Sequence, residues 1–379
     1  MVVLTGIFII YFLLLVIFLV GWKSAMQQQA ETPDTKEPLI TVIIAVRNEA
    51  LTIGNLLRDL SVQEYKNFEI IVVNDYSEDE TLETVGRLAL KNLHILHNWG
   101  TGKKAAITVG VRTARGSIIV TTDADCSVPP RWLKHIRAQF RNPEVMMAFG
   151  GVRLESRGRN SFFDSLQAME FSSLIGTGAS TAALGFPTLC NGANLAFRKK
   201  VFSEVKGYEG NGEIPSGDDE FLLRKIQDRY PGSIRFMNST EVLVSTHSEP
   251  TPEGFLNQRI RWASKWRFNS SLVARGLAVL VLITQVVFIV NWFYVFSPRI
   301  VPSLFLIVIK MILEAAFLLQ VCRYLGTRWN WLAFFSLQII YPLYVIAVAA
   351  TSFLMPYQWK NRTFKPRWPD FPQIKLPWR

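Results

Sequence analysis

Two carboxylates separated by a single alanine, Asp123 and Asp125, follow a run of mostly β-branched residues, Ser117–Thr122. The run has the composition of a short buried strand. Because residues i and i+2 of an extended chain point to the same side, both carboxylates can reach one cation at the end of this strand. Such hard oxygen ligands suit Mg²⁺ or Mn²⁺ completed by substrate phosphates and water. An Asp-x-Asp pair alone more often forms a turn, so the choice between a turn and a cation site depends on the other segments of the chain.

Three consecutive acids, Asp218, Asp219 and Glu220, form a second candidate site. A helical pattern over Phe221–Asp228 follows them, and Ser216 with Asp219 fits a capping box at its start. Three acids exceed what one cap needs, and a carboxylate at a helix start is also well held for work as a general base. The segment by itself is equally compatible with a cap and with a base.

A third candidate site lies in an amphipathic stretch that runs to Phe268. At helical spacing Gln258, Arg261, Trp262 and Lys265 share one face. The planar guanidinium of Arg261 suits a phosphate, and the indole of Trp262 offers a flat surface on which a sugar ring can stack. The stretch also has the composition of a basic helix lying on anionic headgroups. Both descriptions can hold together, because a site for a membrane-bound acceptor belongs at that surface.

The segments that must position these residues alternate between two kinds of periodicity. Strands are predicted at 39–46, 68–74, 93–97 and 117–122, and helices at 50–63, 79–90 and 103–114. This alternation indicates an α/β fold with a mainly parallel sheet and helices on both faces. Ligands of such sheets bind beyond the carboxyl ends of the strands. Those ends carry Arg47, Glu49, Asp75, Asp123 and Asp125, so polar groups from separate strands are expected to converge.

A polar, glycine-containing loop, Leu189–Asn194, lies among apolar residues farther along the chain. Glycine lets the backbone approach a ligand closely, and loops of this kind often carry binding residues. Asn191 and Gly192 are therefore candidates for contact with a substrate.

One motif points to a different class of enzyme. Gly100–Ala105 matches G-x-G-x-x-A between a predicted strand and a predicted helix, and Asp123 follows at about the spacing of a ribose-binding acid. A dinucleotide-binding oxidoreductase is therefore an alternative. Against it, the motif follows the third strand rather than the first, and its helix begins with Lys103 and Lys104, which favour a phosphate-facing loop of another kind.

Composition indicates an integral membrane protein. The 379 residues are 49% hydrophobic and carry a formal charge of +11. Residues 2–22 form an apolar run long enough to span a bilayer, and the basic Lys23 follows rather than precedes it, which indicates an uncleaved anchor. Further apolar runs lie near 277–297, 300–322 and 330–354. The basic residues cluster beside apolar runs without a nucleic-acid-binding signature, so the charge favours a membrane surface over nucleic acid.

The distribution of basic residues predicts the orientation in the membrane. Lys23, Lys36 and a basic middle portion favour a cytoplasmic central domain. The tail, 356–379, is also basic, yet one N-terminal and three C-terminal crossings would put it outside. Either one C-terminal segment is re-entrant or interfacial, with Pro302 and Pro342 as candidate break points, or the tail breaks the charge rule.

Two further patterns concern the compartment and the membrane segments. Cys126, Cys190 and Cys322 are scattered without metal-ligand spacing, as expected in a reducing compartment. Lys310 and Glu314 lie four residues apart within an apolar run, where ionisable groups are usually paired. We expect an intrahelical ion pair, with contact to an acceptor lipid as the alternative.

With these residues placed, the chain resembles the family-2 glycosyltransferases of the GT-A fold, specifically their membrane-integrated branch. That branch includes cellulose, hyaluronan and poly-N-acetylglucosamine synthases, and ceramide glucosyltransferase is similar. The resemblance covers roughly residues 39–270. It depends on four short signals in the expected order: Val46–Glu49, Val73–Ser77, Asp123–Asp125, and Asp218–Asp219 followed by Gln258–Trp262.

The resemblance implies a role for each candidate residue. Binding of the nucleotide sugar is expected of Arg47, Glu49, Asp75, Lys103, Asp123, Asp125 and Arg261. A Mg²⁺ or Mn²⁺ ion is expected on Asp123 and Asp125. Asp219 is expected to be the general base with Asp218 beside it, and contact with the acceptor is expected of Asn191, Gly192, Gln258 and Trp262. Asn74 and Thr108 depart from residues common in the family, which leaves the sugar preference open.

The resemblance also implies an organisation and a reaction. The expected parts are a transmembrane anchor (1–23), a linker (24–38), a GT-A catalytic domain (39–256), an amphipathic interfacial helix (257–275), about three transmembrane helices (276–355) and a basic tail (356–379). The expected reaction moves a sugar, with inversion, from a nucleotide sugar (a UDP-sugar is favoured) to a lipid or glycan presented at the membrane. A processive polysaccharide synthase is the alternative, although three C-terminal segments are few for a polymer channel. The sequence leaves the oligomeric state open.

Overall fold

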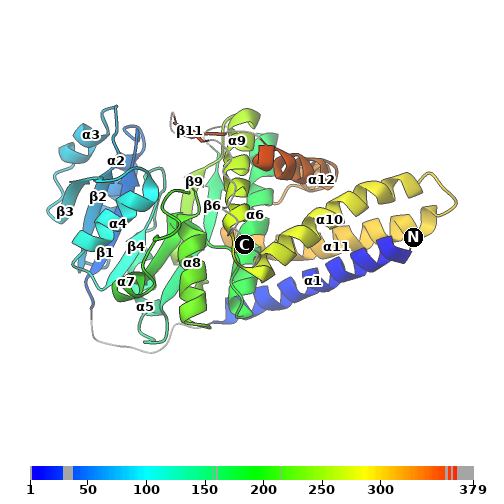
Figure 1. Ribbon diagram of the computed structural model, residues 1–379, viewed down its shortest axis with the longest axis horizontal. Coiled ribbons are helices and arrows are strands. Elements are labelled where there is room, and N and C mark those ends of the chain that lie inside the picture. Colours follow the sequence, from blue (N-terminus) through cyan, green and yellow to red (C-terminus); the bar gives the residue numbers. More distant parts are fainter. Residues whose placement is uncertain are drawn as a thin grey trace, which may run out of the picture.

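A mainly parallel 7-stranded sheet organises the part of the chain that follows the first helix (Figure 1). The computed structural model describes residues 2–28, 37–156, 158, 161–214, 216–354, 357–359 and 362–364. The strands are β1 (Ile40–Val46), β2 (Phe68–Asn74), β3 (Leu93–His97), β4 (Ile118–Thr121), β5 (Met147–Gly150), β7 (Leu195–Arg198) and β8 (Ile234–Met237), in the order β3-β2-β1-β4-β7-β5-β8.

The connection pattern puts a switch point beside β1. The strands from β3 to β4 are parallel neighbours, whereas β7 runs antiparallel between β4 and β5. The chain passes from β1 outward to β2 and β3 and then returns to β4 on the other side of β1. In open α/β sheets ligands bind where the winding direction reverses, at the carboxyl ends of the strands. This crevice lies between the ends of β1 and β4.

The helices of this part follow the predicted alternation. They are α2 (Ile53–Ser61), α3 (Thr81–Arg87), α4 (Lys103–Thr113), α5 (Trp132–Gln139), α7 (Lys199–Glu204) and α8 (Asp218–Arg229), with short 3₁₀ helices η1 (Gly192–Asn194) and η2 (Thr240–Val242). The predicted α/β class is confirmed, and the predicted elements before residue 122 are present with ends that shift by a few residues. Strand β1 is almost entirely buried because helices cover both faces of the sheet.

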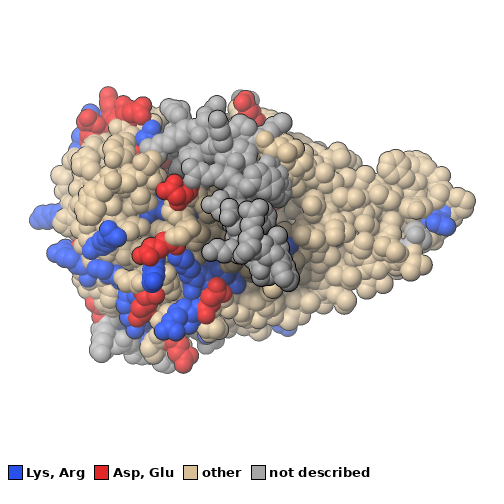
Figure 2. Space-filling view, in the orientation of Figure 1, with Lys and Arg blue, Asp and Glu red and all other residues tan. Residues whose placement is uncertain are grey.

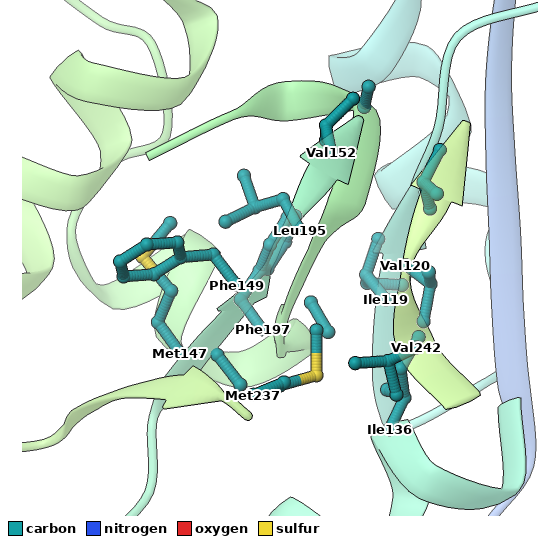
Figure 3. Packing of buried hydrophobic residues seen from close by; sticks show 14 of the residues in the cluster. Ile119, Val120, Ile136, Met147, Phe149, Val152, Leu195, Phe197, Met237 and Val242 are labelled. Atoms are coloured by element: carbon teal, nitrogen blue, oxygen red, sulfur yellow. The ribbon is translucent and has the colours of Figure 1, made fainter. Parts of the chain in front are cut away.

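The core is continuous from the sheet into the first helix, α1 (Val2–Gln27). Buried residues of β4, β5 and β7 belong to the same packed cluster as Phe18 and Trp22 of α1. Figure 3 shows part of this core, with Phe149, Leu195 and Phe197 close together. Helix α1 packs on α6 (Phe162–Ala183), which is also apolar and opens with a capping box at Ser161. A Cβ at Gly21 of α1 would lie 2.7 Å from the carbonyl oxygen of Ser180 in α6, so the two helices cross at van der Waals contact only because this residue is glycine.

Four described helices are long and apolar enough to cross a membrane, judged by length and composition. They are α1, α10 (Leu272–Tyr294), α11 (Ile300–Leu325) and α12 (Trp331–Leu354). In Figure 1, α1, α10 and α11 extend side by side away from the sheet, whereas α12 takes another direction beside α9 (Pro252–Ser264). Figure 2 shows charged side chains gathered over the sheet-containing end and very few on this face of the helical projection. Neither proline breaks its helix, since Pro302 lies in the first turn of α11 and α12 continues through Pro342.

The ion pair expected within the membrane segments is confirmed. Lys310 Nζ lies 2.9 Å from Glu314 Oε1 on the next turn of α11. The hydroxyl of Tyr11 donates to the same carboxylate at 2.7 Å, and Gln338 contacts both partners. The pair therefore has partners from α1 and α12, which tie three apolar helices together.

Other sequence predictions need correction or lie outside the described residues. The amphipathic helix expected at 257–275 begins earlier, at Pro252, and ends at Ser264; a 3₁₀ turn, η3 (Lys265–Phe268), follows, and Leu272 already begins α10. Two small sheets complete the fold: β6 (Val152–Glu155) with β9 (Val244–His247), and β10 (Tyr357–Trp359) with β11 (Arg362–Phe364). The rest of the basic tail, and linker residues 29–36, lie outside the described residues.

Candidate active site

One cavity of about 1410 Å³ is lined by every candidate residue chosen from the sequence. These residues are Arg47, Glu49, Asp75, Lys103, Asp123, Asp125, Asn191, Gly192, Asp218, Asp219, Gln258, Arg261 and Trp262. The cavity lies at the carboxyl ends of β1 and β4, as the strand order requires. The expectation that polar groups from distant segments converge is therefore confirmed; the role of each residue stays a prediction.

The side chain of Arg47 holds the loop after β1 against the loop after β2. Arg47 donates through Nη1 to the carbonyl oxygens of Asp75 and Tyr76, at 2.9 and 2.7 Å, and its Nη2 lies 2.9 Å from Glu78. The Asp75 carboxylate accepts hydrogen bonds from the backbone N–H of Gly102 at 2.9 Å and from Asn98 at 2.7 Å. The glycine-rich loop thus positions Asp75. This structural task explains the G-x-G-x-x-A motif of Gly100–Ala105 without a bound dinucleotide.

Lys103, at the start of α4, bridges two carboxylates from different elements. Its Nζ lies 2.6 Å from Asp123 and 3.2 Å from Asp218. Burial opposes the charge of Lys103, but the two carboxylates outweigh it and raise the lysine pKa. Burial likewise opposes the charge on Asp218, and Lys103 with Lys104 reverses that effect, so the Asp218 pKa is lowered. Both groups are therefore ionised near neutral pH, and the loop after β4 is tied electrostatically to α8.

Lys103→Met is expected to destabilise the fold by at least about 1–3 kcal/mol, because Asp218 would keep a buried charge without its nearest cation. The lowered pKa of Asp218 means that the unfolded chain takes up a proton first as the pH falls. The contribution of the pair is therefore present above the unfolded pKa of about 3.9 and is lost as the pH falls through the lowered folded value. Thermal melting of both proteins at pH 7 and near pH 3 checks this, since the difference in Tm should shrink in acid.

Asp219 is not the capping residue that the sequence suggested. The N-cap of helix α8 is Gly217, in a left-handed conformation with φ 82°, so Ser216 does not cap the helix; the first-turn N–H of Glu220 donates to the Asp219 carboxylate at 2.7 Å. The capping box of Ser216 and Asp219 is therefore wrong. The Asp219 carboxylate instead accepts from the backbone N–H of Gly192 at 3.2 Å and faces the cavity. Glycine at position 217 permits the turn that aims the acid side chains of this helix start inward.

A lysine from the other side of the cavity lies beside these acids. Lys265 Nζ is 2.8 Å from Glu220 and 3.7 Å from Asp219. Burial raises the Glu220 pKa even though Lys265 opposes the shift, while the nearby carboxylates raise the Lys265 pKa against the effect of burial. The sequence placed Lys265 on the same helix face as Arg261 but did not reveal this contact, because it joins segments distant in the chain.

Gly192 lies where a side chain would disturb the acid cluster. A Cβ at this position would lie 2.9 Å from Asp218 Oδ2 and 3.4 Å from Lys103 Nζ. Its carbonyl accepts from Thr121 of β4 at 2.8 Å, and the preceding Asn191 accepts from the backbone of Ala193 at 2.9 Å. The loop is therefore fixed against β4, and glycine is needed for its close approach to α8.

Helix α9 brings the last candidate residues to the cavity wall. Gln258 donates to Glu249 at 3.0 Å, and Trp262 packs on Phe171 of α6 with a ring-centroid distance of 5.9 Å. The guanidinium of Arg259 lies 4.3 Å from the centre of the Trp262 ring. One part of the indole surface that we assigned to a sugar is thus already in contact with Arg259.

Several cavity residues were missed by sequence reasoning. Glu170 of α6 and Arg259 of α9 form a buried ion pair in the wall, and Tyr344 of α12 contacts it. The sequence does contain a signal for Glu170, because this acid lies between two apolar residues, Met169 and Phe171, in the middle of α6. The wall also includes aliphatic residues of two membrane-helix candidates: Leu277, Ala278, Val281, Leu282, Val345 and Val348. The cavity therefore continues from the acid cluster to the apolar helices.

A divalent cation would have few protein ligands here. Asp123 and Asp125 line the same cavity, but the expected extended strand is wrong here, because β4 ends at Thr121 and Asp125 lies in a turn. Asp123 lies 2.6 Å from Lys103 Nζ, and Asp125 accepts from the Thr246 hydroxyl at 3.3 Å. Within the described ranges, no group of three or more His, Cys, Asp or Glu side chains is arranged to hold a metal ion. Two hard carboxylates fit a Mg²⁺ or Mn²⁺ ion that takes its remaining ligands from phosphate and water.

Comparisons with known proteins agree with this geometry. Residues 41–206 match the family model described as Glycosyl transferase family 2. The chain is 25% identical over 270 residues to the poly-β-1,6-N-acetyl-D-glucosamine synthase of Staphylococcus aureus (strain COL), covering 68% of this chain and 63% of that protein. The corresponding synthase of Staphylococcus epidermidis is 24% identical over 268 residues, with the same shares of 68% and 63%. The chain thus spans about 63% of the length of these curated relatives.

The fold has a counterpart among solved structures. A mannosyltransferase from Pyrobaculum calidifontis, solved in complex with GDP-Man and Mn²⁺, superimposes with a TM-score of 0.55 at 18% identity. The superposition covers 93% of this chain and 96% of that one. The likeness therefore extends over most of the chain and is not confined to the sheet.

Proposed function

Because the chain is a membrane glycosyltransferase of family 2 with the GT-A fold, we propose that it transfers a sugar from a nucleotide-sugar donor to a membrane-presented acceptor. The proposal depends on one observation: acidic and basic residues at the ends of strands and the starts of helices line the same cavity as residues of the apolar helices. A UDP-sugar is the favoured donor, and inversion at the anomeric carbon is the favoured outcome.

Asp219 is the proposed general base. Its carboxylate lies in the cavity beside the Gly192 backbone, 3.7 Å from Lys265, in the first turn of α8. It takes the proton of an acceptor hydroxyl, the resulting oxygen attacks the anomeric carbon, and the bond from that carbon to the diphosphate oxygen breaks. One displacement inverts the configuration of that carbon. Asp218 forms an ion pair with Lys103, and through this contact it stabilises the arrangement of the site.

The donor side is proposed at the ends of β1, β2 and β4. Asp75 and the loop of Arg47 and Glu49 hold the nucleotide, while Asp123 and Asp125 face its diphosphate. A bound Mg²⁺ or Mn²⁺ ion would offset charge on the departing diphosphate. Arg261 and Lys103 line the same cavity and supply further positive charge to that group. The relation to a structure that holds GDP-Man and Mn²⁺ supports a nucleotide sugar and a divalent ion here.

A lipid is the favoured acceptor. The wall beyond Trp262 is formed mainly by small and aliphatic side chains of α10 and α12, together with Tyr341, Tyr344 and the basic Arg275. Aliphatic surface suits an acyl or prenyl chain, whereas a growing glycan needs hydrogen-bonding groups along its path. The acceptor hydroxyl would then reach Asp219, past Gln258 and Trp262 on α9 and the loop of Asn191 and Gly192.

Polysaccharide synthesis is the second candidate. The 25% identity to poly-β-1,6-N-acetyl-D-glucosamine synthases favours it, and the alignment covers 63% of their length. A polymer channel would need more apolar helices than the four in the described part of this chain, unless copies assemble.

The proposed location is a membrane with the catalytic domain in the cytoplasm. If α1, α10 and α11 cross the bilayer and α12 lies along its surface, as its separate direction in Figure 1 suggests, the tail returns to the side of the catalytic domain. This arrangement satisfies the positive-inside rule for Lys23 and for the basic tail at once. It corresponds to the interfacial alternative among the sequence interpretations.

Product analysis tests the proposal. Membranes from cells that express the chain are incubated separately with labelled UDP-glucose, UDP-N-acetylglucosamine and GDP-mannose, with control membranes lacking it. A lipid-extractable monoglycoside is the expected product, and an insoluble chain would favour polysaccharide synthesis instead. Absence of transfer and of donor hydrolysis with all three sugars would contradict both.

A further inference from the structure

The ion pair between Glu170 and Arg259 is among the most deeply buried charge pairs of the described residues. The Glu170 and Arg259 side chains are only 5% and 4% exposed. Arg259 Nη2 lies 2.5 Å from Glu170 Oε2, and its Nε lies 3.2 Å from each carboxylate oxygen. The pair therefore joins α6 and α9 through a guanidinium fork, which fixes orientation as well as distance.

Arg259 also contacts both neighbouring residues that we assign to the acceptor. Its Nη1 donates to the side-chain oxygen of Gln258. Its guanidinium lies 4.3 Å from the centre of the Trp262 ring and 4.5 Å from that of Phe255. A cation placed against a ring in a desolvated position stabilises one orientation of that ring. The side chains of Gln258 and Trp262 are thus oriented by a single residue that lies between them in the sequence.

The other contacts of this group come from the wall that leads to the membrane helices. The hydroxyl of Tyr344, on α12, donates to Glu170 at 3.4 Å. Gln258 donates to Glu249 at 3.0 Å, and the backbone of Glu249 exchanges hydrogen bonds with Gln167 of α6 at 2.9 and 3.0 Å. Helices α6, α9 and α12 therefore meet at Glu170 and Arg259.

We propose that Arg259, held by Glu170, is a positioning residue that orients Gln258 and Trp262 toward the acceptor. This inference rests on the proposed function and assigns a task to two residues, Glu170 and Arg259, to which the sequence analysis gave no role. A buried ion pair is seldom retained for stability, because apolar residues of similar size usually serve as well. What apolar residues do not replace here is the directed contact with the Gln258 amide and the Trp262 ring.

The decisive variant replaces both partners at once. In Glu170→Met with Arg259→Met, no charge is left buried without a partner, so the fold and binding of the nucleoside diphosphate with Mn²⁺ should be retained. Transfer should nevertheless fall about 10–100-fold, because the acceptor-facing side chains lose their fixed geometry. Arg259→Lys should likewise keep diphosphate binding and lose transfer, since an ammonium group cannot reproduce the planar fork of the guanidinium. A matched control removes an exposed ion pair, Arg131 and Glu64 at 2.8 Å, with the same double change to Met.

The measurements are transfer into lipid extract, with whichever of UDP-glucose, UDP-N-acetylglucosamine and GDP-mannose the wild type uses, and calorimetric titration with the matching nucleoside diphosphate and Mn²⁺. Retained diphosphate affinity with reduced transfer, against wild-type transfer in the control, supports the positioning role. Wild-type transfer in the folded double variant would overturn it and leave the pair a structural contact. Failure of the wild type to transfer any of the three sugars would instead overturn the proposed function, so the two failures are distinguishable.

Discussion

Asp219→Asn is expected to reduce transfer by about 10²–10⁴-fold while nucleotide affinity stays within a few-fold of wild type. The oxygen of an asparagine can keep the hydrogen bond from the Gly192 backbone, which the carboxylate accepts at 3.2 Å, and only the local bond from the Glu220 backbone at 2.7 Å is given up. It cannot take a proton from an acceptor hydroxyl at neutral pH. The structure of the loop should therefore survive while the chemistry is lost. Transfer into lipid extract and a titration with UDP and Mn²⁺ measure the two effects separately.

The matched control for this change is Asp228→Asn on the same helix. Asp228 lies near the other end of α8, its side chain is 62% exposed, and it pairs only loosely with Arg224 at 3.4 Å. Removal of a surface charge of this kind changes stability little. Near-normal transfer in Asp219→Asn would move the base to another group, whereas equal loss in both variants would indicate a general defect of α8.

Asp125→Ala is expected to abolish the stimulation of nucleotide binding by Mn²⁺ and to lower transfer at least about 100-fold, since a bound metal ion contributes several kcal/mol of charge stabilisation. The Asp125 carboxylate accepts from the Thr246 hydroxyl at 3.3 Å and from the Cys126 thiol at 3.9 Å, and it lines the cavity. Binding of UDP should be titrated with and without Mn²⁺ in both proteins. Unchanged metal dependence would refute the role of Asp125 as a ligand.

Removal of the metal itself should act in the same direction. Excess EDTA is expected to stop transfer by the wild type, and an excess of Mg²⁺ or Mn²⁺ added afterwards should restore it, because two carboxylates alone cannot hold the ion against a chelator. Glu83→Ala, which removes an exposed carboxylate from α3, serves as the charge control and should respond to EDTA as the wild type does. Full transfer in EDTA would exclude a metal from the reaction.

Much of the proposed donor side could be predicted from local pattern. Strand ends are visible in the sequence because β-branched runs stop at polar residues, and the parallel order of such strands brings Arg47, Asp75 and Asp123 to one edge. The pairing of Lys310 with Glu314 was equally predictable, since one helical turn separates them. The boundaries of α9 were harder to predict, because its first turn, from Pro252, lacks the periodicity of the residues that follow.

The capping box shows where local pattern was misleading. Ser216 and Asp219 have the spacing of a cap, but the left-handed Gly217 starts the helix differently and leaves Asp219 to the cavity. The backbone conformation of a glycine is set by its tertiary surroundings. The same holds for Lys103, because its second partner, Asp218, lies more than a hundred residues farther along the chain.

By itself, the sequence determined the alternating strands and helices, the apolar helices at both ends and the set of polar residues that meet in one cavity, because each depends on periodicity or on residues adjacent in the chain. Only the tertiary structure decided which charges pair there. The bridge made by Lys103, the pairing of Glu170 with Arg259 and the aliphatic wall from α10 and α12 all join distant segments. No local pattern encodes such contacts, since they arise when packed elements bring side chains within a few ångströms.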